Sequence, residues 1–379
     1  MRGMEIIPIR HTGAEYDVSA YNLEAARAAR AFHRTLPGYG ATPLRELRGL
    51  AEAMGLKGFM VKDESPRFGL NAFKALGGSY AIHSLLTDRP QTFVTATDGN
   101  HGRGVAWAAR VLGQRAVVYM PRGSAKERLE NIRAQGAEAS ILDMPYDDAV
   151  RHAKRQADAN DWVLVQDTAW PGYTDIPRRI MQGYTTMGLE ILEALADRRP
   201  THVFLQAGVG SMAGAMAGFF ANAYGEERPK VIVVEPLTAD CIFRTAKAND
   251  GALHSCEGTK MRTIMAGLCC GEPCSIAWDL LREHADFALR MSDDIAATGM
   301  RVLGNPLEGD ARVISGESGA STTGALFELM TNPNREGERR LLGLDGNSEV
   351  LAISTEGDTD RKNYRDIVWR GKYADDQVK

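Results

Sequence analysis

A glycine-rich segment offers a site for a phosphate group. The segment Gly208-Val209-Gly210-Ser211-Met212-Ala213-Gly214 lies between the apolar run VFLQ and the small-residue stretch AGAMAGFFANAY. Free N–H groups and the positive dipole end at the start of a helix bind anions. The same letters satisfy the dinucleotide fingerprint G-x-G-x-x-A, and Glu235 ends the next predicted strand, where a ribose-binding acid would stand. From this segment alone, a nicotinamide enzyme, another phosphate ligand and simple packing of helix on strand all stay open.

A lysine at the start of a predicted helix is a candidate nucleophile. Lys74 lies in NAFKALGGSYAIHSLL, between Phe73 and a run of small and apolar residues. A lysine that forms a Schiff base must be partly desolvated, because burial lowers its pKa and favours the neutral amine. The same pattern also fits a lysine whose stem lies along an apolar surface while its charge reaches solvent.

Two polar turns follow predicted strands. The first is Thr97-Asp98-Gly99-Asn100-His101, where glycine lets the backbone come close to a ligand. The second contains Asp167, in the string QDTAWPGY. Taken alone, the first is equally a simple turn and the second a turn or helix-capping acid.

The elements that position these residues alternate along the chain. Apolar, β-branched runs are separated by amphipathic stretches, such as those over 125–135, 147–159 and 179–195, and this predicts βαβ units, mostly parallel sheet and helices on both faces. In such sheets ligands bind beyond the carboxyl ends of the strands. The predicted strands are Phe93–Thr97, Ala116–Met120, Ala139–Leu142, Val163–Gln166, Val203–Gln206, Val231–Val234 and Val350–Ser354.

Taken together, these segments resemble the fold type II, tryptophan synthase β-like, pyridoxal-phosphate enzymes. Thr42-Pro43-Leu44 is similar to the TPL near the start of those chains, and Phe73-Lys74 to their Schiff-base lysine. Gly99-Asn100 resembles their asparagine loop, and the segment from Gly208 to Gly214 their phosphate loop. The resemblance runs from about Pro37 to the last strand, and it implies a two-lobed α/β fold with pyridoxal 5'-phosphate as the cofactor.

The resemblance also implies roles for single residues. Asn100 would contact the 3-hydroxyl of the cofactor, while the backbone N–H groups of Thr97, Asp98, Gly99, Asn100 and His101 would hold a substrate carboxylate. The 5'-phosphate would lie on Gly208, Val209, Gly210 and Ser211, although valine and serine replace two of the glycines usual in the family. Thr355, or failing it Ser354, would face the pyridine nitrogen.

Within that family the chain is most similar to the diaminopropionate ammonia-lyases. Strings that carry the likeness include FGLNAFKALGG, TDGNHGRGVAWAA, MAGLCCGEP, ISGESGA and STEGDTD. Asp98 stands where most related enzymes have serine or alanine, and Asp167 adds a second carboxylate. Two carboxylates suit 2,3-diaminopropionate, because one amine binds the cofactor and the other is an ammonium that needs an anionic partner. The alternatives are a serine or threonine dehydratase, a non-catalytic cofactor carrier and the nicotinamide enzyme.

The same resemblance suggests that both enantiomers of the substrate react. Lys74 would take the Cα proton of the L-isomer from one face, and Asp98 that of the D-isomer from the other face. A carboxylate is a far stronger base than a serine hydroxyl at neutral pH. The alternative is that Asp98 only binds the second ammonium of the substrate.

Composition limits the partners and the setting of the chain. Its 379 residues carry a formal charge of −4, so there is no excess of basic residues for binding nucleic acid. No stretch reaches the length of a membrane span, so we expect a cytoplasmic protein. We also expect a large part formed by residues 1–89 and 185–379, a small mobile part formed by 90–184, and a homodimer as in the family.

The five cysteines do not form the pattern of a secreted disulfide framework. They are odd in number and confined to one part of the chain, from Cys241 to Cys274. The string CGEPC contains two closely spaced cysteines, as one half of a zinc-binding motif does, but the chain has no second pair of cysteines with matching spacing. We therefore expect reduced thiols and no metal, and a bridge between Cys241 and Cys270 stays open.

Overall fold

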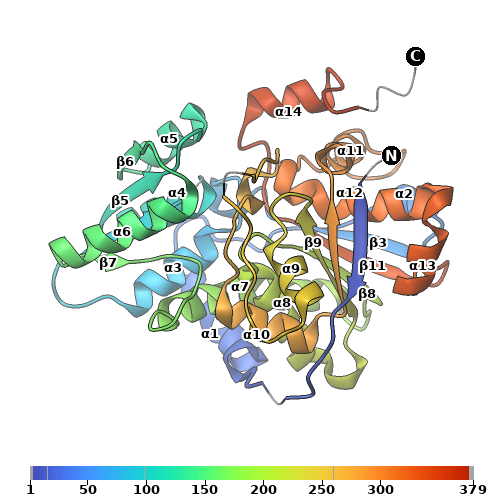
Figure 1. The fold of residues 1–379 in the computed structure, drawn as a ribbon, viewed down its shortest axis with the longest axis horizontal. Coiled ribbons are helices and arrows are strands. Elements are labelled where there is room, and N and C mark those ends of the chain that lie inside the picture. The colour runs from blue at the N-terminus through green and yellow to red at the C-terminus, as the bar shows by residue number, and fades with distance from the viewer. Residues whose placement is uncertain (1–2, 15, 98, 259, 375–379) are drawn as a thin grey trace.

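Two separate sheets organise the chain (Figure 1). The structure is a computed structural model, and it describes residues 3–14, 16–97, 99–258 and 260–374. One sheet has seven strands and the other has four, and helices surround both. This is the α/β architecture, with mostly parallel sheets, that the alternating sequence pattern predicts.

The larger sheet has the strand order β1-β10-β9-β8-β11-β3-β2. Its five inner strands are parallel to one another, and the edge strands β1 and β2 pair antiparallel to their neighbours. The strands are β1 (Met4–Pro8), β2 (Leu44–Glu46), β3 (Gly58–Asp63), β8 (His202–Gln206), β9 (Lys230–Pro236), β10 (Phe287–Met291) and β11 (Glu349–Ser354).

The smaller sheet has the order β6-β5-β4-β7, and all of its strands are parallel. Figure 1 shows it at one end of the molecule, together with α4, α5 and α6. Its strands are β4 (Thr92–Ala96), β5 (Arg115–Met120), β6 (Glu138–Ile141) and β7 (Val163–Leu164).

Helices cover both faces of the larger sheet because its inner strands are apolar on both sides. Val231 and Val233 of β9 belong to one hydrophobic cluster, and Ile232 and Val234 belong to another. Successive side chains of a strand point to opposite faces, so a continuous apolar run marks a strand buried on both. The first cluster involves α1 (Leu23–His33), α3 (Ala75–Ser84), α4 (Asn100–Val111), α7 (Asp175–Leu195), α8 (Ser211–Tyr224), α9 (Cys241–Ala248) and α10 (Ser275–His284).

The second cluster lies on the other face of the larger sheet, and a third lies under the smaller one. The second involves α2 (Arg48–Ala53), α11 (Asp293–Gly304), α12 (Glu317–Thr331), α13 (Glu336–Leu342) and α14 (Arg361–Val368). In the third, α6 (Tyr146–Asn160) packs on β4 and β5. The short helix α5 (Lys126–Arg133) packs against α4 and β6.

All seven strands predicted from the sequence are present, with ends that shift by one or two residues. Strand β9 is longer than predicted and ends at Pro236, whereas β7 is shorter and ends at Leu164 instead of Gln166. Beyond the end of β7, the side chain of Gln166 bonds to the backbone of β4 in place of a strand backbone. Its Oε1 accepts the N–H of Ala96 at 3.0 Å, and its Nε2 donates to the carbonyl of Ala96 at 3.1 Å. Strands β1, β2, β3 and β10 were not predicted.

A buried polar network fastens β3 to α7. Lys62 Nζ lies 2.6 Å from Glu190 Oε2, and Arg67 bonds both to Glu190 and to Glu64. Thr42 of the TPL string joins the network, since its hydroxyl donates to Glu64 Oε1 at 2.5 Å. Two cations and two carboxylates neutralise one another here, as buried charges require.

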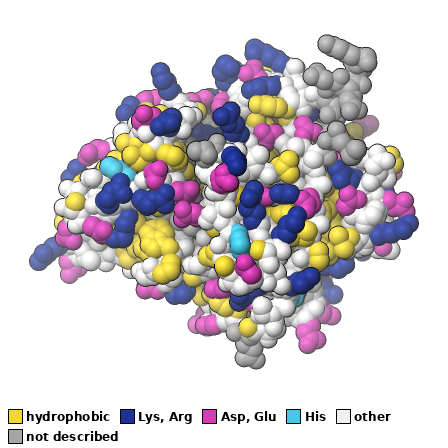
Figure 2. Space-filling model, viewed as in Figure 1, with side chains coloured by type: hydrophobic (Ala, Val, Ile, Leu, Met, Phe, Trp, Pro, Cys, Tyr) yellow, Lys and Arg dark blue, Asp and Glu magenta, His cyan; other side chains and the backbone are white. Residues whose placement is uncertain are grey.

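The surface carries mixed charges. Figure 2 shows lysine and arginine side chains interspersed with aspartate and glutamate over the visible face. Within the described part of the chain, no helix is both long and apolar enough to span a membrane.

Candidate active site

Lys74 directly precedes α3 and is held from two sides. The N–H of Phe73 donates to the carbonyl of Thr355 at 3.1 Å, which ties this segment to the chain after β11. On the other side, a Cβ placed on Gly104 of α4 would lie 3.0 Å from the carbonyl carbon of Lys74. The glycine therefore allows a close approach that fixes the backbone of the lysine.

The amine of Lys74 pairs with Asp167, which lies three residues after β7. Lys74 Nζ donates to Asp167 Oδ2, and the aspartate side chain is only 5% exposed. Ser211, at the start of α8, donates its hydroxyl to the backbone carbonyl of Asp167 at 2.5 Å. The pair thus brings together the starts of α3 and α8 and the turn after β7.

The charges of this pair stabilise each other. Burial lowers the pKa of Lys74, but the Asp167 carboxylate raises it by more, so the pKa lies above its ordinary value. Burial raises the pKa of Asp167, but His101 and Lys74 lower it by more, to about 2. The expectation that burial keeps the Lys74 amine neutral is therefore wrong for this state of the protein, because it left out the carboxylate.

His101 lies beside the pair. Its Nε2 donates to the carbonyl of Val165 at 2.8 Å, and burial lowers its pKa, so the imidazole is neutral near pH 7 with its hydrogen on Nε2. Its Nδ1 lies 3.8 Å from Asp167 Oδ2 and has no hydrogen-bond partner among the described residues. Nδ1 and Oδ2 are two neighbouring acceptors, an arrangement that suits an ammonium group.

The turn before α4 brings backbone N–H groups to the same cavity. Thr97 Oγ1 accepts the N–H of Gly99 at 2.9 Å, which closes the turn. Asn100 is the first residue of α4, and the first N–H groups of a helix have no partner within it. Thr97, Asn100 and His101 all line the cavity. Asp98, the predicted second base, lies outside the described residues.

The glycine-rich segment joins β8 to α8, as the sequence predicts. Gly210 has φ = 96°, a left-handed conformation that glycine adopts easily and other residues adopt at a cost. A Cβ on Gly208 would lie 3.2 Å from the carbonyl oxygen of Gly267, so this residue is also closely packed. Gly208, Val209, Gly210 and Ser211 line the cavity, next to the free N–H groups at the start of α8.

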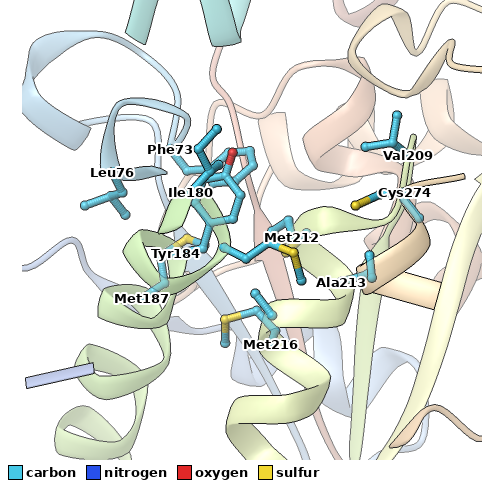
Figure 3. Packing of buried hydrophobic residues seen from close by; sticks show 14 of the residues in the cluster. Phe73, Leu76, Ile180, Tyr184, Met187, Val209, Met212, Ala213, Met216 and Cys274 are labelled. Atoms are coloured by element: carbon cyan, nitrogen blue, oxygen red, sulfur yellow. The ribbon is translucent and has the colours of Figure 1, made fainter. Parts of the chain in front are cut away.

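Buried hydrophobic side chains support this segment and Lys74 together. Figure 3 shows Met212 and Met216 of α8 facing α7, which contributes Tyr184 and Met187. The ring centroid of Phe73 lies 4.8 Å from that of Tyr184. Because close-packed side chains resist relative movement, we expect the lysine and the glycine-rich segment to keep a fixed spacing.

Of the two hydroxyls predicted at the end of β11, that of Thr355 lines the cavity. Ser354 instead donates to the hydroxyl oxygen of Ser315 at 2.7 Å. Gln206 donates its Nε2 to Thr355 Oγ1 at 2.9 Å, so the Thr355 hydroxyl keeps its own hydrogen for another acceptor. These contacts favour Thr355 over Ser354.

Known proteins with similar sequences decide the family. The family model described as pyridoxal-phosphate dependent enzyme matches residues 35–342. The diaminopropionate ammonia-lyase of Salmonella typhimurium is 49% identical over 390 aligned positions, which cover 96% of each chain. The chain belongs to the diaminopropionate ammonia-lyase family of pyridoxal-phosphate-dependent enzymes.

Solved structures of this family have the same fold. The Escherichia coli diaminopropionate ammonia-lyase in complex with an aminoacrylate-PLP azomethine reaction intermediate superimposes with a TM-score of 0.92, at 47% identity over 99% of each chain. The E. coli enzyme in complex with D-serine gives a TM-score of 0.93, at 46% identity over 98% of each chain.

The residues around the cavity fit the cofactor of this family. The Lys74 amine, the Thr355 hydroxyl and the closely packed glycine-rich segment at the start of α8 all line one space. Two buried polar atoms of its wall, Gln206 Oε1 and Ser318 Oγ, have no hydrogen-bond partner within the described residues. Buried polar atoms need partners, and a polar ligand supplies them.

Membership of this family overturns the nicotinamide alternative. Glu235, which stands where a ribose-binding acid would lie, has another function. Its carboxylate accepts the N–H groups of Ile242 and Phe243 at 2.9 and 2.7 Å and so caps the start of α9.

The cysteines are free thiols in this structure, so a bridge between Cys241 and Cys270 is not formed. Cys270 lines the cavity, whereas Cys241 and Cys274 are buried. Cys274 has a structural contact of its own, because its N–H donates to the carbonyl of Val209 at 2.8 Å.

Sequence reasoning missed several residues that line the cavity. Glu356 was missed although it directly follows Thr355, where a polar residue after a strand was a usable signal. Ser318 lies in the quoted string ISGESGA but was given no role, because it is the second residue of a helix that no predicted strand precedes. Cys270 lies in the quoted string MAGLCCGEP, but it was considered only for a disulfide or a metal. Tyr146, from α6, lies in none of the quoted strings.

Proposed function

We propose that this chain eliminates ammonia from 2,3-diaminopropionate with pyridoxal 5'-phosphate as cofactor, so that diaminopropionate and one water give pyruvate and two molecules of ammonia. The observation that carries the proposal is the buried Asp167 carboxylate, which pairs with the ammonium of Lys74 beside the neutral His101. The close relationship to enzymes named diaminopropionate ammonia-lyase supports the same reaction.

Asp167 can change partners during turnover. Here it neutralises the Lys74 ammonium. Once the Lys74 nitrogen is bound to the cofactor or has lost its proton, the carboxylate has lost a positively charged partner in a buried place, which is costly. The second ammonium of the substrate restores the charge pair, and Nδ1 of His101 can accept a further hydrogen bond from it. A substrate with a hydroxyl at that position cannot neutralise Asp167.

The cofactor would be held by residues from four segments. Lys74 would hold it covalently, the N–H groups from Gly208 to Ser211 would bind its phosphate, and Asn100 would face its 3-hydroxyl. When bound, the cofactor stabilises negative charge at Cα of the substrate. Thr355 would donate its hydroxyl hydrogen to the pyridine nitrogen, which leaves that nitrogen uncharged. An uncharged nitrogen withdraws fewer electrons and so favours rapid loss of the β-amine.

The substrate carboxylate would bind at the start of α4. The N–H groups of Asn100 and His101 lie at the positive end of a helix of 12 residues. The N–H of Thr97 instead donates to the carbonyl of Tyr119, and that of Gly99 to Thr97 Oγ1, so these two are not free for a ligand in this structure. The neutral form of His101 adds no competing charge. A carboxylate held there and an ammonium held at Asp167 would orient the substrate at two points, which fixes Cα relative to Lys74.

We further propose that the enzyme accepts both enantiomers, with Lys74 as the base for the L-isomer and Asp98 as the base for the D-isomer. A family member crystallised with D-serine supports a site that admits the D-configuration. Lys74 lines the cavity from the position directly before α3. Asp98 directly precedes the Gly99-Asn100 turn of the other lobe, which supports a position on the opposite face of the substrate.

We also propose a cytoplasmic homodimer with a small mobile part, residues 90–184, and a large part, residues 1–89 and 185–379. The separate four-stranded sheet lies within the first range, which supports two units. Its upper limit falls within α7, and that helix packs on α3 and α8 of the larger part.

A single assay tests the reaction. The purified holoenzyme is supplied with diaminopropionate, and pyruvate and ammonia are both measured; we expect two molecules of ammonia for each pyruvate. Lys74→Ala should abolish turnover and leave the fold intact, while Lys126→Ala, at an exposed position, should change neither. Borohydride reduction and peptide mapping should find the cofactor on Lys74. Label on another lysine, or pyruvate from serine but not from diaminopropionate, would contradict the proposal.

A further inference from the structure

Glu356 is a buried carboxylate in the wall of the active-site cavity, and its side chain bonds to Asn100. It is 2% exposed and directly follows Thr355. Its Oε1 accepts the N–H of Ser318 at 3.1 Å, and its Oε2 accepts the Nδ2 group of Asn100 and, at 3.4 Å, the hydroxyl of Thr359. Ser318 lies in the first turn of α12, where the helix dipole stabilises negative charge.

These contacts determine the orientation of the Asn100 side chain. An ionised carboxylate can only accept hydrogen bonds, so the group of Asn100 that faces Glu356 must be the amide NH₂. The amide oxygen and the second amide hydrogen of Asn100 are then left for a ligand. The carboxylate therefore decides which end of this amide meets the ligand.

We propose that Glu356 is a positioning residue that sets the orientation of the Asn100 amide toward the cofactor. This inference rests on the proposed contact between Asn100 and the 3-hydroxyl of pyridoxal phosphate. Glu356 acts through Asn100, so its removal should matter only while Asn100 is present.

The substitution Glu356→Gln should reverse the orientation of the Asn100 side-chain amide. The N–H of Ser318 is fixed by the backbone, so the amide oxygen of the new glutamine would stay at the Oε1 position. The glutamine NH₂ would then occupy the Oε2 position and face Asn100. Two NH₂ groups cannot bond to each other, so Asn100 would turn its oxygen toward position 356 and offer its NH₂ group elsewhere.

The test is a double-mutant cycle of four proteins: the parent, Glu356→Gln, Asn100→Ala and the combination. The dissociation constant of pyridoxal phosphate and the position of the visible absorbance band of the holoenzyme are measured for each. Glu356→Gln alone should weaken cofactor binding by about tenfold, which is one lost orienting contact, and should shift the band. In the Asn100→Ala background the same substitution should change neither quantity.

The control is Glu317→Gln, which alters a neighbouring buried carboxyl that bonds to Asn363 and not to Asn100. It should leave the absorbance band in place. An unchanged cofactor affinity and band in Glu356→Gln would overturn the inference. So would an effect that persists in full with Asn100→Ala, because Glu356 would then act on the ligand directly or through the fold.

A second pair of variants tests the same contact from the side of Asn100, and its first member leaves Glu356 unchanged. Asn100→Asp places two carboxylates together and should weaken cofactor binding strongly. Adding Glu356→Gln restores one hydrogen bond, in which the glutamine at position 356 is the donor and the aspartate at position 100 is the acceptor. The double variant should therefore recover part of the affinity for the cofactor. Absence of any recovery would count against the inference. Pyruvate formation by the parent reports separately on the proposed function.

Discussion

Asp167 is the residue whose partner must change during the proposed reaction. Its carboxylate has a pKa lowered to about 2 in the structure, because His101 and Lys74 outweigh the opposite effect of burial. While Lys74 is its charged partner, this carboxylate stays ionised near neutral pH, as a binding site for an ammonium group requires. We therefore propose that Asp167 binds the substrate ammonium and does not take the proton from Cα.

We predict that Asp167→Asn lowers kcat/KM for diaminopropionate by about 30-fold, near the 2 kcal/mol that a hydrogen bond to a charged group contributes. Any side activity on serine should fall much less, because serine has no second ammonium. Steady-state kinetics on both substrates measure the difference, with the exposed Asp175→Asn as the matched control. Equal losses on the two substrates would show that Asp167 has a structural or general catalytic role.

Asp98 has the complementary role in the proposed reaction. We predict that Asp98→Asn lowers turnover of D-diaminopropionate by about 100-fold, the usual contribution of a general base, and keeps much of the L-activity. Separate assays with the two enantiomers measure this, with Asp88→Asn on the exposed surface as control. If both enantiomers lost activity to the same degree, Asp98 would be a substrate-binding residue and the two-base mechanism would be wrong.

At the scale of elements, the loop between β8 and α8 is defined by its backbone more than by its side chains. Gly210 has φ = 96°, and a Cβ there would lie 3.1 Å from Cδ1 of Ile242. Both constraints act on the N–H groups that are proposed to hold the phosphate. A small change in this turn would therefore alter cofactor binding before it altered the sheet.

We predict that Gly210→Ala weakens the affinity for pyridoxal phosphate about fivefold to thirtyfold, since a side chain in the left-handed region costs roughly 1–2 kcal/mol. Equilibrium titration with the cofactor measures this. Gly251→Ala is the matched control, because Gly251 also has a positive φ, 85°, but has no atoms near its Cβ position. A similar loss of affinity in both variants would mean that the effect is general destabilisation and not a change in the phosphate loop.

Strands are predicted well from the sequence where they are formed by buried apolar residues only. Strands β8, β9 and β11 are continuous apolar runs, and each was predicted within two residues of its ends. Strand β3 was missed because it contains Lys62. In the structure the buried charge of Lys62 is neutralised by Glu190, which lies more than a hundred residues away in the chain. A partner so distant in the chain cannot be recognised from the local sequence. The lysine therefore makes this short run look unlike a buried strand, although the strand does form.

At the scale of the whole molecule, the candidate site follows from a rule that the sequence already supports. Asn100, Asp167, Gly208 and Thr355 each lie just beyond the carboxyl end of a parallel strand, and the structure brings them to one cavity. What could not be predicted are the pairings across it, such as that of Lys74 with Asp167. These depend on how the two sheets face each other, and no periodicity in the sequence records that.

One such pairing across the fold concerns Glu317. This carboxyl is 3% exposed at the start of α12, accepts a hydrogen bond from Asn363 Nδ2 at 2.5 Å, and lies near the carboxylate of Glu356. Burial, and then the charge of Glu356, raise the pKa of Glu317 to about 7, while the hydrogen bond from Asn363 and the charge of Arg128 partly oppose this.

The raised pKa of Glu317 predicts that this one carboxyl destabilises the fold increasingly as the pH rises from about 4 to 7. In the unfolded chain this carboxyl ionises near pH 4.3, so at low pH it is protonated in both states and contributes nothing. Between pH 4 and 7 the unfolded state has lost the proton that the folded state keeps, which favours unfolding, and above pH 7 the penalty is constant. Glu317→Gln keeps the oxygen that faces Asn363 and removes the ionisation, so the variant should be more stable than the parent above pH 7 by at most about 4 kcal/mol. Denaturant unfolding at several pH values measures the gap, with Glu308→Gln on the exposed surface as control. A gap that does not grow between pH 4 and 7 would mean that Glu317 ionises in the folded protein as easily as in the unfolded chain.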